Sequence, residues 1–209
     1  LDMAYTAPSY YAERFPLTTL IGLPYLVHDK FAGNQAISAV METYLQQEFE
    51  DVKPLAIYIG PGTEIAARSE IHTVDDLAGL RMRVAGKELD ATAKLMGMQP
   101  GNMPLPNLYE NLQKGVFDGG FLTGAALAVF HLNEVLSYYI VSGLAQGPVM
   151  FIMNPEFYDN LPPDLQEMID TEFTGLPLAD WGSRCFSEAD ALGFERAEES
   201  GGTITVWDE

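Results

Sequence analysis

The sequence predicts an α/β fold of two lobes, and two observations support this prediction. Segments with a helical period alternate with short strand-like segments along the whole chain, which is typical of α/β folds with largely parallel strand pairing. Two clusters of glycine and proline, at residues 60–62 and 146–148, interrupt the strand-like pattern, and we interpret them as chain crossings between lobes. The predicted lobes are residues 1–60 with 148–180 (lobe I) and residues 61–147 with 181–209 (lobe II). A cleft between two such lobes is the expected place for a small ligand.

The first elements follow from local patterns. Residues 3–6 form a short extended run that Pro8 closes, and residues 35–50 repeat apolar side chains at the period of an amphipathic helix. The mostly apolar segment at residues 52–59 predicts a buried strand, which the cluster at 60–62 is expected to break.

A capped turn and a strand with two arginines come next. Thr73 is placed to cap a short helical turn that begins with acidic residues, and Gly79 ends this turn. Apolar residues then alternate with Arg81 and Arg83 over residues 80–84, which is the period of a strand with one apolar and one cationic face. Because ligands collect at the carboxyl ends of strands in open α/β sheets, Arg83 is the candidate anion ligand and Arg81 a solvated or structural residue.

The remaining elements are four helices, three of which are followed by glycine, and the strands between them. They are the helices 89–96, 107–114, 163–173 and 180–200, and the strands 116–122, 148–153 and 203–207.

Composition and charge exclude several classes of protein. With 47% hydrophobic residues the chain can build a core, and without a run of eighteen apolar residues it is not expected to span a membrane. The formal net charge of −19 argues against a nucleic-acid partner. The only cysteine is Cys185, so an internal disulfide is impossible. The sequence shows no signal peptide at Leu1, and we expect its start to be mature or truncated.

Motifs for catalysis and for cofactors are missing from the pattern. Residues 60–62 lack the further glycine and the Lys-Ser or Lys-Thr of a phosphate loop. The three histidines, His28, His72 and His131, lack the spacing of a metal-binding helix, and no serine nucleophile elbow is present. We therefore expect no catalytic residue, no metal and no cofactor.

Two further segments can face a ligand. Tyr10 and Tyr11 follow the first strand, where tyrosine offers a flat apolar wall and a hydroxyl group, although packing against Phe15 and Leu17 is an equally good interpretation. Residues 103–106 lead into a helix whose N-terminus can face the same space, with the alternative that their prolines only set the start of the helix.

Taken together, these segments resemble the solute-receptor subunit of tripartite ATP-independent periplasmic (TRAP) transporters, of the dicarboxylate-receptor (DctP-like) type. The match runs in order through residues 2–11, 14–17, 23–26, 51–53, 76–84, 103–104, 108–119, 153–154 and 161–166. Members of the family are longer than this chain, so the resemblance implies that segments are missing before Leu1 and after Glu209.

The resemblance implies a two-lobed, type II periplasmic-binding-protein fold with a long helix that braces both lobes. It also implies a monomeric periplasmic receptor that binds a small organic carboxylate and delivers it to membrane permease subunits. The position of Arg83 matches the arginine that forms a bidentate salt bridge with the ligand carboxylate. The other residues expected to shape the ligand site are Thr6, Ala7, Tyr10, Met103, Leu105, Phe121, Leu122 and Thr123.

The chain departs from its relatives at three places. Thr63 stands where sialic-acid receptors of the family carry a second pocket arginine, and Leu122 stands where they carry a pocket asparagine, which disfavours sialic acid. Residues 123–125 are small where many relatives have proline and tryptophan, so we expect room there for an apolar or bulky end of the ligand. The alternatives are a ligand-sensing binding domain and, on the same scaffold, an enzyme.

Overall fold

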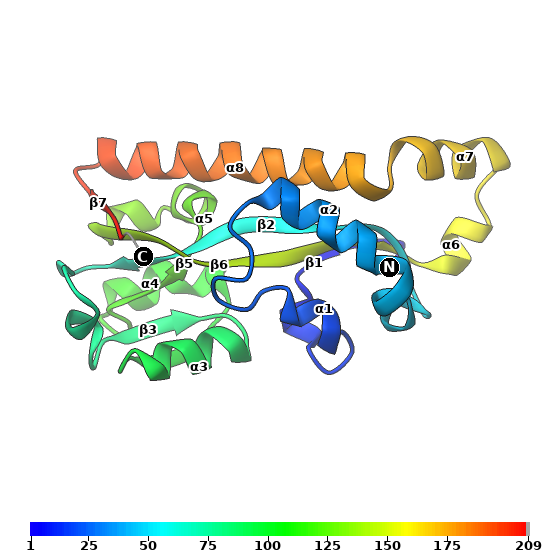
Figure 1. Cartoon of the computed structure of the whole chain (residues 1–209). Coiled ribbons are helices and arrows are strands. Elements are labelled where there is room, and N and C mark those ends of the chain that lie inside the picture. Colours follow the sequence, from blue (N-terminus) through cyan, green and yellow to red (C-terminus); the bar gives the residue numbers. More distant parts are fainter. Residues whose placement is uncertain (208–209) are drawn as a thin grey trace. The chain divides into compact units, whose positions relative to one another are not determined.

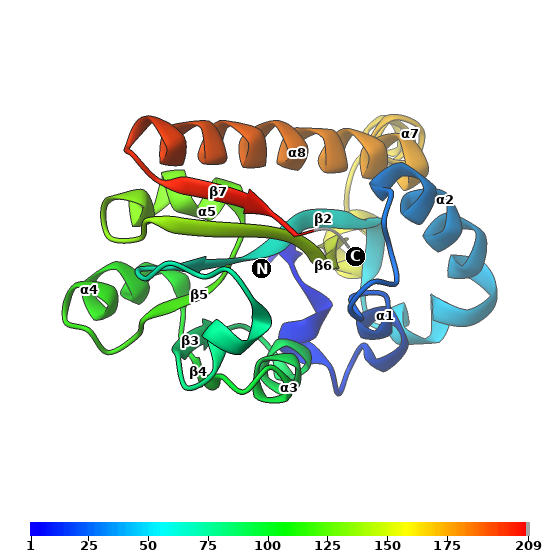
Figure 2. The same cartoon turned by 60° about the vertical axis from the view of Figure 1, so that its left-hand side comes forward.

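The structure of the chain, a computed structural model, describes residues 1–207 (Figures 1 and 2). The chain divides into two compact units. Unit 1 comprises residues 1–60 and 145–186, and unit 2 comprises residues 61–144 and the chain from Ser187 on. Two long strands, β2 (Lys53–Ala67) and β6 (Tyr138–Met153), and the long helix α8 (Gly175–Glu199) each continue from one unit into the other.

Unit 1 is built from strand pairing and from helices that begin at caps or prolines. Strand β1 (Met3–Thr6) pairs antiparallel with β6, with Thr6 opposite Met150, and β2 lies on the other side of β6. The helices are the 3₁₀ turn Pro8–Tyr11, α1 (Pro16–Leu20), α2 (Lys30–Val40), the irregular turns Met41–Leu45 and Gln46–Phe49, α6 (Pro155–Asp159), α7 (Pro163–Glu172) and the first part of α8.

Two buried polar groups fix the helices of unit 1. The Glu48 carboxylate accepts hydrogen bonds from the backbone N–H of Leu17 and from the N–H and hydroxyl of Thr18, the last at 2.6 Å. Asn34 of α2 accepts from the Ile59 N–H at 2.8 Å and donates to Ser183 of α8 at 3.0 Å. Since a buried polar group without a partner is costly, these contacts specify how α1, α2 and α8 pack within the unit.

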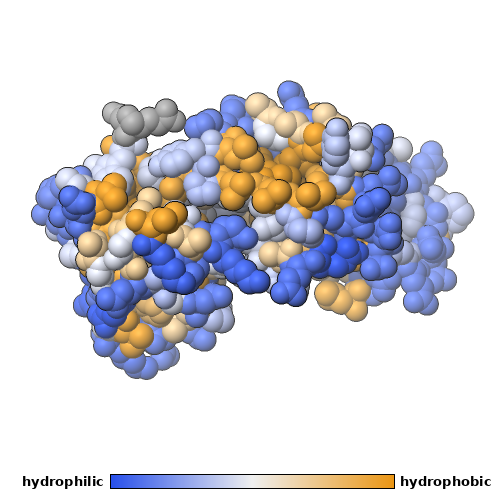
Figure 3. Space-filling view, turned by 60° about the horizontal axis from the view of Figure 1, so that its bottom comes forward, coloured by the Kyte–Doolittle hydropathy of each residue, from blue (hydrophilic) through white to orange (hydrophobic). Residues whose placement is uncertain are grey.

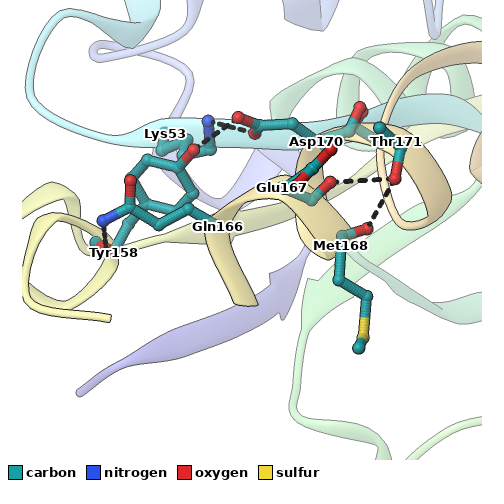
Figure 4. A network of polar contacts seen from close by, with 8 residues as sticks. Lys53, Tyr158, Gln166, Glu167, Met168, Asp170 and Thr171 are labelled. Carbon is teal, nitrogen blue, oxygen red and sulfur yellow. Dashed lines mark hydrogen bonds and ion pairs between the residues drawn. The ribbon is translucent and has the colours of Figure 1, made fainter. Parts of the chain in front are cut away.

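The α6–α7 segment is attached to the start of β2 (Figure 4). The Lys53 ammonium lies 2.9 Å from the Asp170 carboxylate and 3.8 Å from the centre of the Tyr158 ring, and the Tyr158 hydroxyl donates to the same carboxylate. Gln166 donates to the Tyr158 carbonyl at 3.1 Å. An ion pair and a hydrogen bond therefore meet at the Asp170 carboxylate, and the cation–π contact joins their two donors, Lys53 and Tyr158. The hydrogen bond from Tyr158 is the largest cause that lowers the pKa of Asp170.

Unit 2 has a βαβαβ core. Strands β3 (Arg81–Val84), β4 (Gln99–Asn102) and β5 (Gly119–Leu122) run parallel, β5 pairs antiparallel with β2, and β7 (Thr203–Val206) pairs parallel with β6. The helices are the 3₁₀ turn Val74–Leu77, α3 (Lys87–Leu95), the 3₁₀ turn Leu105–Asn107, α4 (Leu108–Gln113), α5 (Gly124–Val129), the 3₁₀ turn Leu132–Glu134 and the end of α8.

Side chains of the unit 2 strands alternate between two apolar clusters. Met82, Val84 and Phe121 belong to one cluster. Leu122 belongs to the other cluster, with side chains from α4 and α5. This alternation is the two-residue period of a sheet that is covered on both faces.

Several predicted boundaries are confirmed. Thr73 and Asp76 form a capping box, in which the Asp76 carboxylate accepts from the Thr73 N–H at 2.9 Å, although the turn is 3₁₀ rather than α-helical. Gly79, Gly97 and Gly115 adopt positive φ angles of 81°, 76° and 68° where the sequence predicts helix ends, because only glycine takes this conformation without a steric penalty.

Three predictions about the elements are wrong. The glycine–proline clusters at 60–62 and 146–148 do not end strands, since β2 and β6 continue through them. Their glycines keep φ angles outside the left-handed region, and proline fits an extended strand where its missing N–H is not needed. The helix predicted at 35–50 begins earlier, at Lys30 after the Asp29 cap, and becomes irregular after Val40.

The sheet is mixed rather than largely parallel. The βαβ connections through α3 and α4 make β3, β4 and β5 parallel, whereas β1 and β5 run antiparallel to β6 and β2. The division into lobes I and II stays a prediction. The last two residues of predicted lobe II lie outside the described residues.

The surface carries apolar side chains among polar ones, as the face in Figure 3 shows. Exposed large apolar residues include Tyr10, Leu26, Tyr44 and Trp181. Within residues 1–207, none of the helices has the length and the apolar character needed to cross a membrane.

Candidate functional site

The carboxyl ends of three parallel strands define a candidate site in unit 2 (Figure 2). Arg83 of β3 is opposite Gly101 of β4 and Gly120 of β5, so the chain that follows each strand leaves the sheet at the same edge. In open α/β sheets this edge is the usual place for a ligand. The structure thus brings together Arg83 and the predicted residues from 103 to 105 and from 121 to 123.

Arg83 is buried and oriented by backbone carbonyls. Its residue is only 4% exposed, although arginine is rarely buried in proteins. The Nε–H donates to the Met103 carbonyl at 2.8 Å, and Nη1 donates to the Phe121 carbonyl at 3.3 Å. These bonds come from the ends of β4 and β5 and fix the plane of the guanidinium. A guanidinium fixed in a plane matches the two oxygens of a carboxylate.

Glycines occupy the positions opposite Arg83 on both neighbouring strands, and Gly120 makes space for Arg83 whereas Gly101 makes space for the Phe117 ring. A Cβ atom on Gly120 would lie 3.1 Å from both the Cβ and the carbonyl oxygen of Arg83, and a Cβ on Gly101 would lie 2.7 Å from the Phe117 ring. The missing side chain at position 120 therefore lets β5 approach the backbone and Cβ of Arg83 closely. Sequence reasoning missed Gly120 and Gly101, although the Gly-Gly dipeptide at 119–120 was a signal of close backbone approach.

Arg81 has a structural role, as predicted. Its Nε and Nη2 donate to the two oxygens of Asp118 at 2.9 and 2.6 Å, and its backbone N–H donates to the same carboxylate at 2.9 Å. The hydrogen bonds from Arg81 lower the pKa of Asp118. This pair connects the starts of β3 and β5, at the opposite end of the strands from the predicted ligand edge.

The other predicted residues of unit 2 lie around Arg83, and two of them, Met103 and Phe121, contact it through their backbone carbonyls. The side chains of Phe121 and Leu122 are 1% and 3% exposed and belong to the two apolar clusters. Met103 and Leu105 are half-buried against the cluster of α4 and α5. The Thr123 hydroxyl caps α5 by accepting from the Ala126 N–H at 3.1 Å. Contact of these five residues with a ligand stays a prediction.

The small residues at 123–125 do not leave room, which corrects the expectation of free space there. A Cβ on Gly124 would lie 2.3 Å from the Asp190 carbonyl oxygen, and a Cβ on Gly193 would lie 1.8 Å from the Gly124 carbonyl oxygen. The backbones of α5 and α8 are therefore in direct contact, and the Ala125 N–H donates to the Asp190 carboxylate at 2.9 Å. Close packing of two helices explains the small residues.

The predicted residues of the first strand and loop lie in unit 1. Thr6 pairs with Met150 in the sheet, and Ala7 is the N-cap of the turn that contains Tyr10. Tyr10 and Tyr11 are 59% and 56% exposed, and their packing against Phe15 and Leu17 stays a prediction. Participation of Thr6, Ala7 and Tyr10 in ligand binding stays a prediction.

Sequence reasoning missed two groups of side chains. In unit 1, Tyr5, Tyr58, Phe151 and Phe186 form an aromatic cluster with ring centres 5.2–6.4 Å apart, and burial raises the pKa of Tyr5 to about 12. Residues so far apart in the chain give no local signal of this contact.

In unit 2, a buried carboxyl group lies near the end of β5. Glu64 of β2 is 8% exposed and accepts hydrogen bonds from the Ser142 N–H at 2.7 Å and the Ser142 hydroxyl at 3.2 Å. Burial raises the pKa of Glu64, and the negative charge of Asp190 adds to this effect. In residues 1–207, no three His, Cys, Asp or Glu side chains gather into a group that could hold a metal ion.

The fold agrees with solved receptors. A TRAP solute-binding protein from Rhodoferax ferrireducens T118, solved with copurified benzoate, is 29% identical, with a TM-score of 0.92 over 99% of this chain and 66% of that one. A marine-metagenome TRAP solute-binding protein specific for aromatic acids, solved with metahydroxyphenylacetate, is 25% identical, with a TM-score of 0.92 over 100% of this chain and 67% of that one. The predicted α/β binding-protein fold is confirmed.

The chain belongs to the bacterial extracellular solute-binding proteins, family 7 (DctP), whose family model matches residues 1–206. Among curated proteins it is similar to the C4-dicarboxylate-binding periplasmic protein DctP of Rhodobacter capsulatus, at 28% identity over 69% of this chain and 44% of that protein. It is also similar to a solute-binding protein of a Sulfitobacter strain, at 25% identity over 81% of this chain and 52% of that protein. The chain spans about half the length of these curated relatives. The predicted resemblance to TRAP solute receptors is confirmed.

Proposed function

We propose that the full-length protein is the periplasmic receptor of a TRAP transporter, and that it binds a small organic carboxylate through Arg83. The observation that carries this proposal is the buried guanidinium at the carboxyl ends of β3, β4 and β5, with its plane fixed by the Met103 and Phe121 carbonyls. A carboxylate accepts two parallel N–H bonds from such a group, and a lysine ammonium cannot reproduce this geometry.

The ligands of the similar solved proteins support a carboxylate. Benzoate and metahydroxyphenylacetate are bound by the two structures described above, and mandelate is bound by a TRAP protein of Bordetella bronchiseptica that is 27% identical to this chain. All three ligands share one carboxylate and otherwise differ in shape. This shared group is what a single oriented arginine recognises.

The receptor performs no chemistry and acts as a monomer that presents its ligand to the membrane permease subunits. Family membership supports delivery to a permease. A ligand can drive a change in the receptor only if it binds one conformation more tightly than another, so the complex with the carboxylate is the form that the permease recognises.

A melting-temperature screen of the full-length protein tests the proposal. A ligand at one hundred times its dissociation constant stabilises the folded state by about 2.7 kcal/mol. We expect a clear increase with benzoate or another small carboxylate, and none with benzamide, which has the same ring without the charge. The increase should be absent in Arg83→Ala. An increase with benzamide or a neutral sugar but with no carboxylate would contradict the proposal.

A further inference from the structure

Two acidic side chains lie beside the end of β5, where Glu64 is opposite Leu122 and Asp190 binds the Ala125 N–H. Glu64 of β2 is buried, and its carboxyl group lies over Gly62, where an added Cβ would be 3.0 Å from Oε1. The Asp190 carboxylate of α8 accepts from the Ala125 N–H at the start of α5, and its charge acts on Glu64. Both groups therefore belong to the part of unit 2 that surrounds the end of β5.

The strand register places Glu64 on the same sheet face as Arg83. Arg83 is opposite Gly120, and Glu64 is opposite Leu122, two residues further toward the carboxyl end of β5. Residues that are paired across strands or two apart along a strand share a face. With strands about 4.8 Å apart and a rise of about 3.3 Å per residue, the two Cα atoms are roughly 12 Å apart.

The charged side chains of unit 2 near Arg83 bear on how many negative charges a ligand can carry. Arg83 supplies a buried positive charge, and the Arg81 guanidinium forms an ion pair with the Asp118 carboxylate at the other end of the strand. Lys87, at the start of α3, is exposed to solvent, where its field is screened. A second carboxylate on the ligand would meet the field of the acidic pair in a protein of net charge −19.

We propose that Glu64, with Asp190, makes this receptor selective for acids with a single negative charge over dicarboxylates. This inference rests on the proposed role of Arg83 and adds the class of ligand. At a separation of about 10 Å and an effective dielectric constant of about 20, one carboxylate repels another enough to weaken binding about tenfold. Glu64 acts through its field, so the ligand need not contact it.

Pairs of acids with nearly the same shape and different charge test this inference. The probes are succinamate against succinate, and 3-carbamoylbenzoate against isophthalate, titrated calorimetrically into the full-length protein at about pH 7 and about pH 9. Two pH values are used because burial raises the pKa of Glu64 and only its ionised form supplies the repelling charge. We expect the wild type to bind the monoanion of a pair at least tenfold more tightly. Glu64→Gln should narrow this ratio about tenfold, and Glu64→Asp, which keeps the charge, should preserve it.

Glu48→Gln is the matched control, because Glu48 is a similarly buried carboxylate, 6% exposed, that lies in unit 1. Glu48→Gln should leave the ratio of monoanion to dianion affinity unchanged. If Glu64→Gln fails to fold, Asp190→Asn replaces it and should narrow the same ratio. Equal binding of monoanion and dianion by the wild type, or an unchanged ratio in the folded Glu64→Gln variant, would overturn the inference and leave the role of Arg83 intact. Failure of every monoanion to bind would instead overturn the carboxylate function and this inference with it.

Discussion

The contact between α5 and α8 gives a stability prediction that follows directly from the coordinates. In Gly193→Ala the new Cβ would lie 1.8 Å from the Gly124 carbonyl oxygen. Neither partner is a flexible side chain, so one helix backbone must move by roughly 1 Å or more within a closely packed interior. Overpacking costs about 1–3 kcal/mol or more, and the better helix propensity of alanine offsets only about 1 kcal/mol of it.

We expect Gly193→Ala to destabilise the full-length protein by about 2 kcal/mol, which lowers the Tm by about 4–8 °C in a protein of this size range. Gly147→Ala is the matched control, because an added Cβ there meets nothing within 4 Å and φ is not in the left-handed region. That substitution should be neutral or stabilise by about 0.4–1 kcal/mol. Thermal unfolding followed by circular dichroism measures both variants, and a Tm of Gly193→Ala equal to or above that of Gly147→Ala would refute the reasoning.

Two further predictions concern pH. The folded state raises the pKa of Glu64 above its usual 4.5, so the contribution of Glu64 to stability is full below that pH and is lost as the pH rises through the raised value. Urea denaturation should therefore show wild type losing stability relative to Glu64→Gln as the pH rises above 4.5 and through the raised pKa, and a constant difference would contradict the assignment. The pKa of Asp118 is lowered from 3.8 by Arg81, so its contribution is present above 3.8 and is lost as the pH falls through the lowered value. The advantage of wild type over Asp118→Asn should disappear in acid, and an advantage that persists there would count against the Arg81 pair.

Local signals in the sequence predicted local structure well. The capping box of Thr73 and Asp76 and the helix ends at Gly97 and Gly115 depend on residues within a few positions of each other, so one sequence is enough to identify them. The position of Arg83 near the carboxyl end of a strand was also predicted from local signals, because strand alternation is visible in the sequence.

Features that depend on distant partners were missed or misinterpreted. Glycine at positions 60 and 147 indicates a turn in isolation, but each lies in a continuous strand whose backbone is extended. Gly124 indicated free space, whereas a side chain there would clash with the backbone of Asp190, far away in the sequence. The same holds for Glu64, whose hydrogen bonds to Ser142 join residues 78 positions apart. A single sequence records the residue type at such positions but not the neighbour that explains it.

The central claim, that Arg83 binds a ligand carboxylate, is tested most directly by calorimetric titration of one small carboxylate, identified in the melting-temperature screen, into three variants of the full-length protein. Arg83→Ala should weaken binding by about 2–5 kcal/mol, because the desolvated carboxylate loses its charged partner. Arg83→Lys should also weaken binding, though less, since the charge remains and the bidentate geometry is lost. Arg81→Ala should retain an affinity close to that of the wild type. Equal losses at Arg81 and Arg83, or wild-type affinity in Arg83→Ala, would contradict the account.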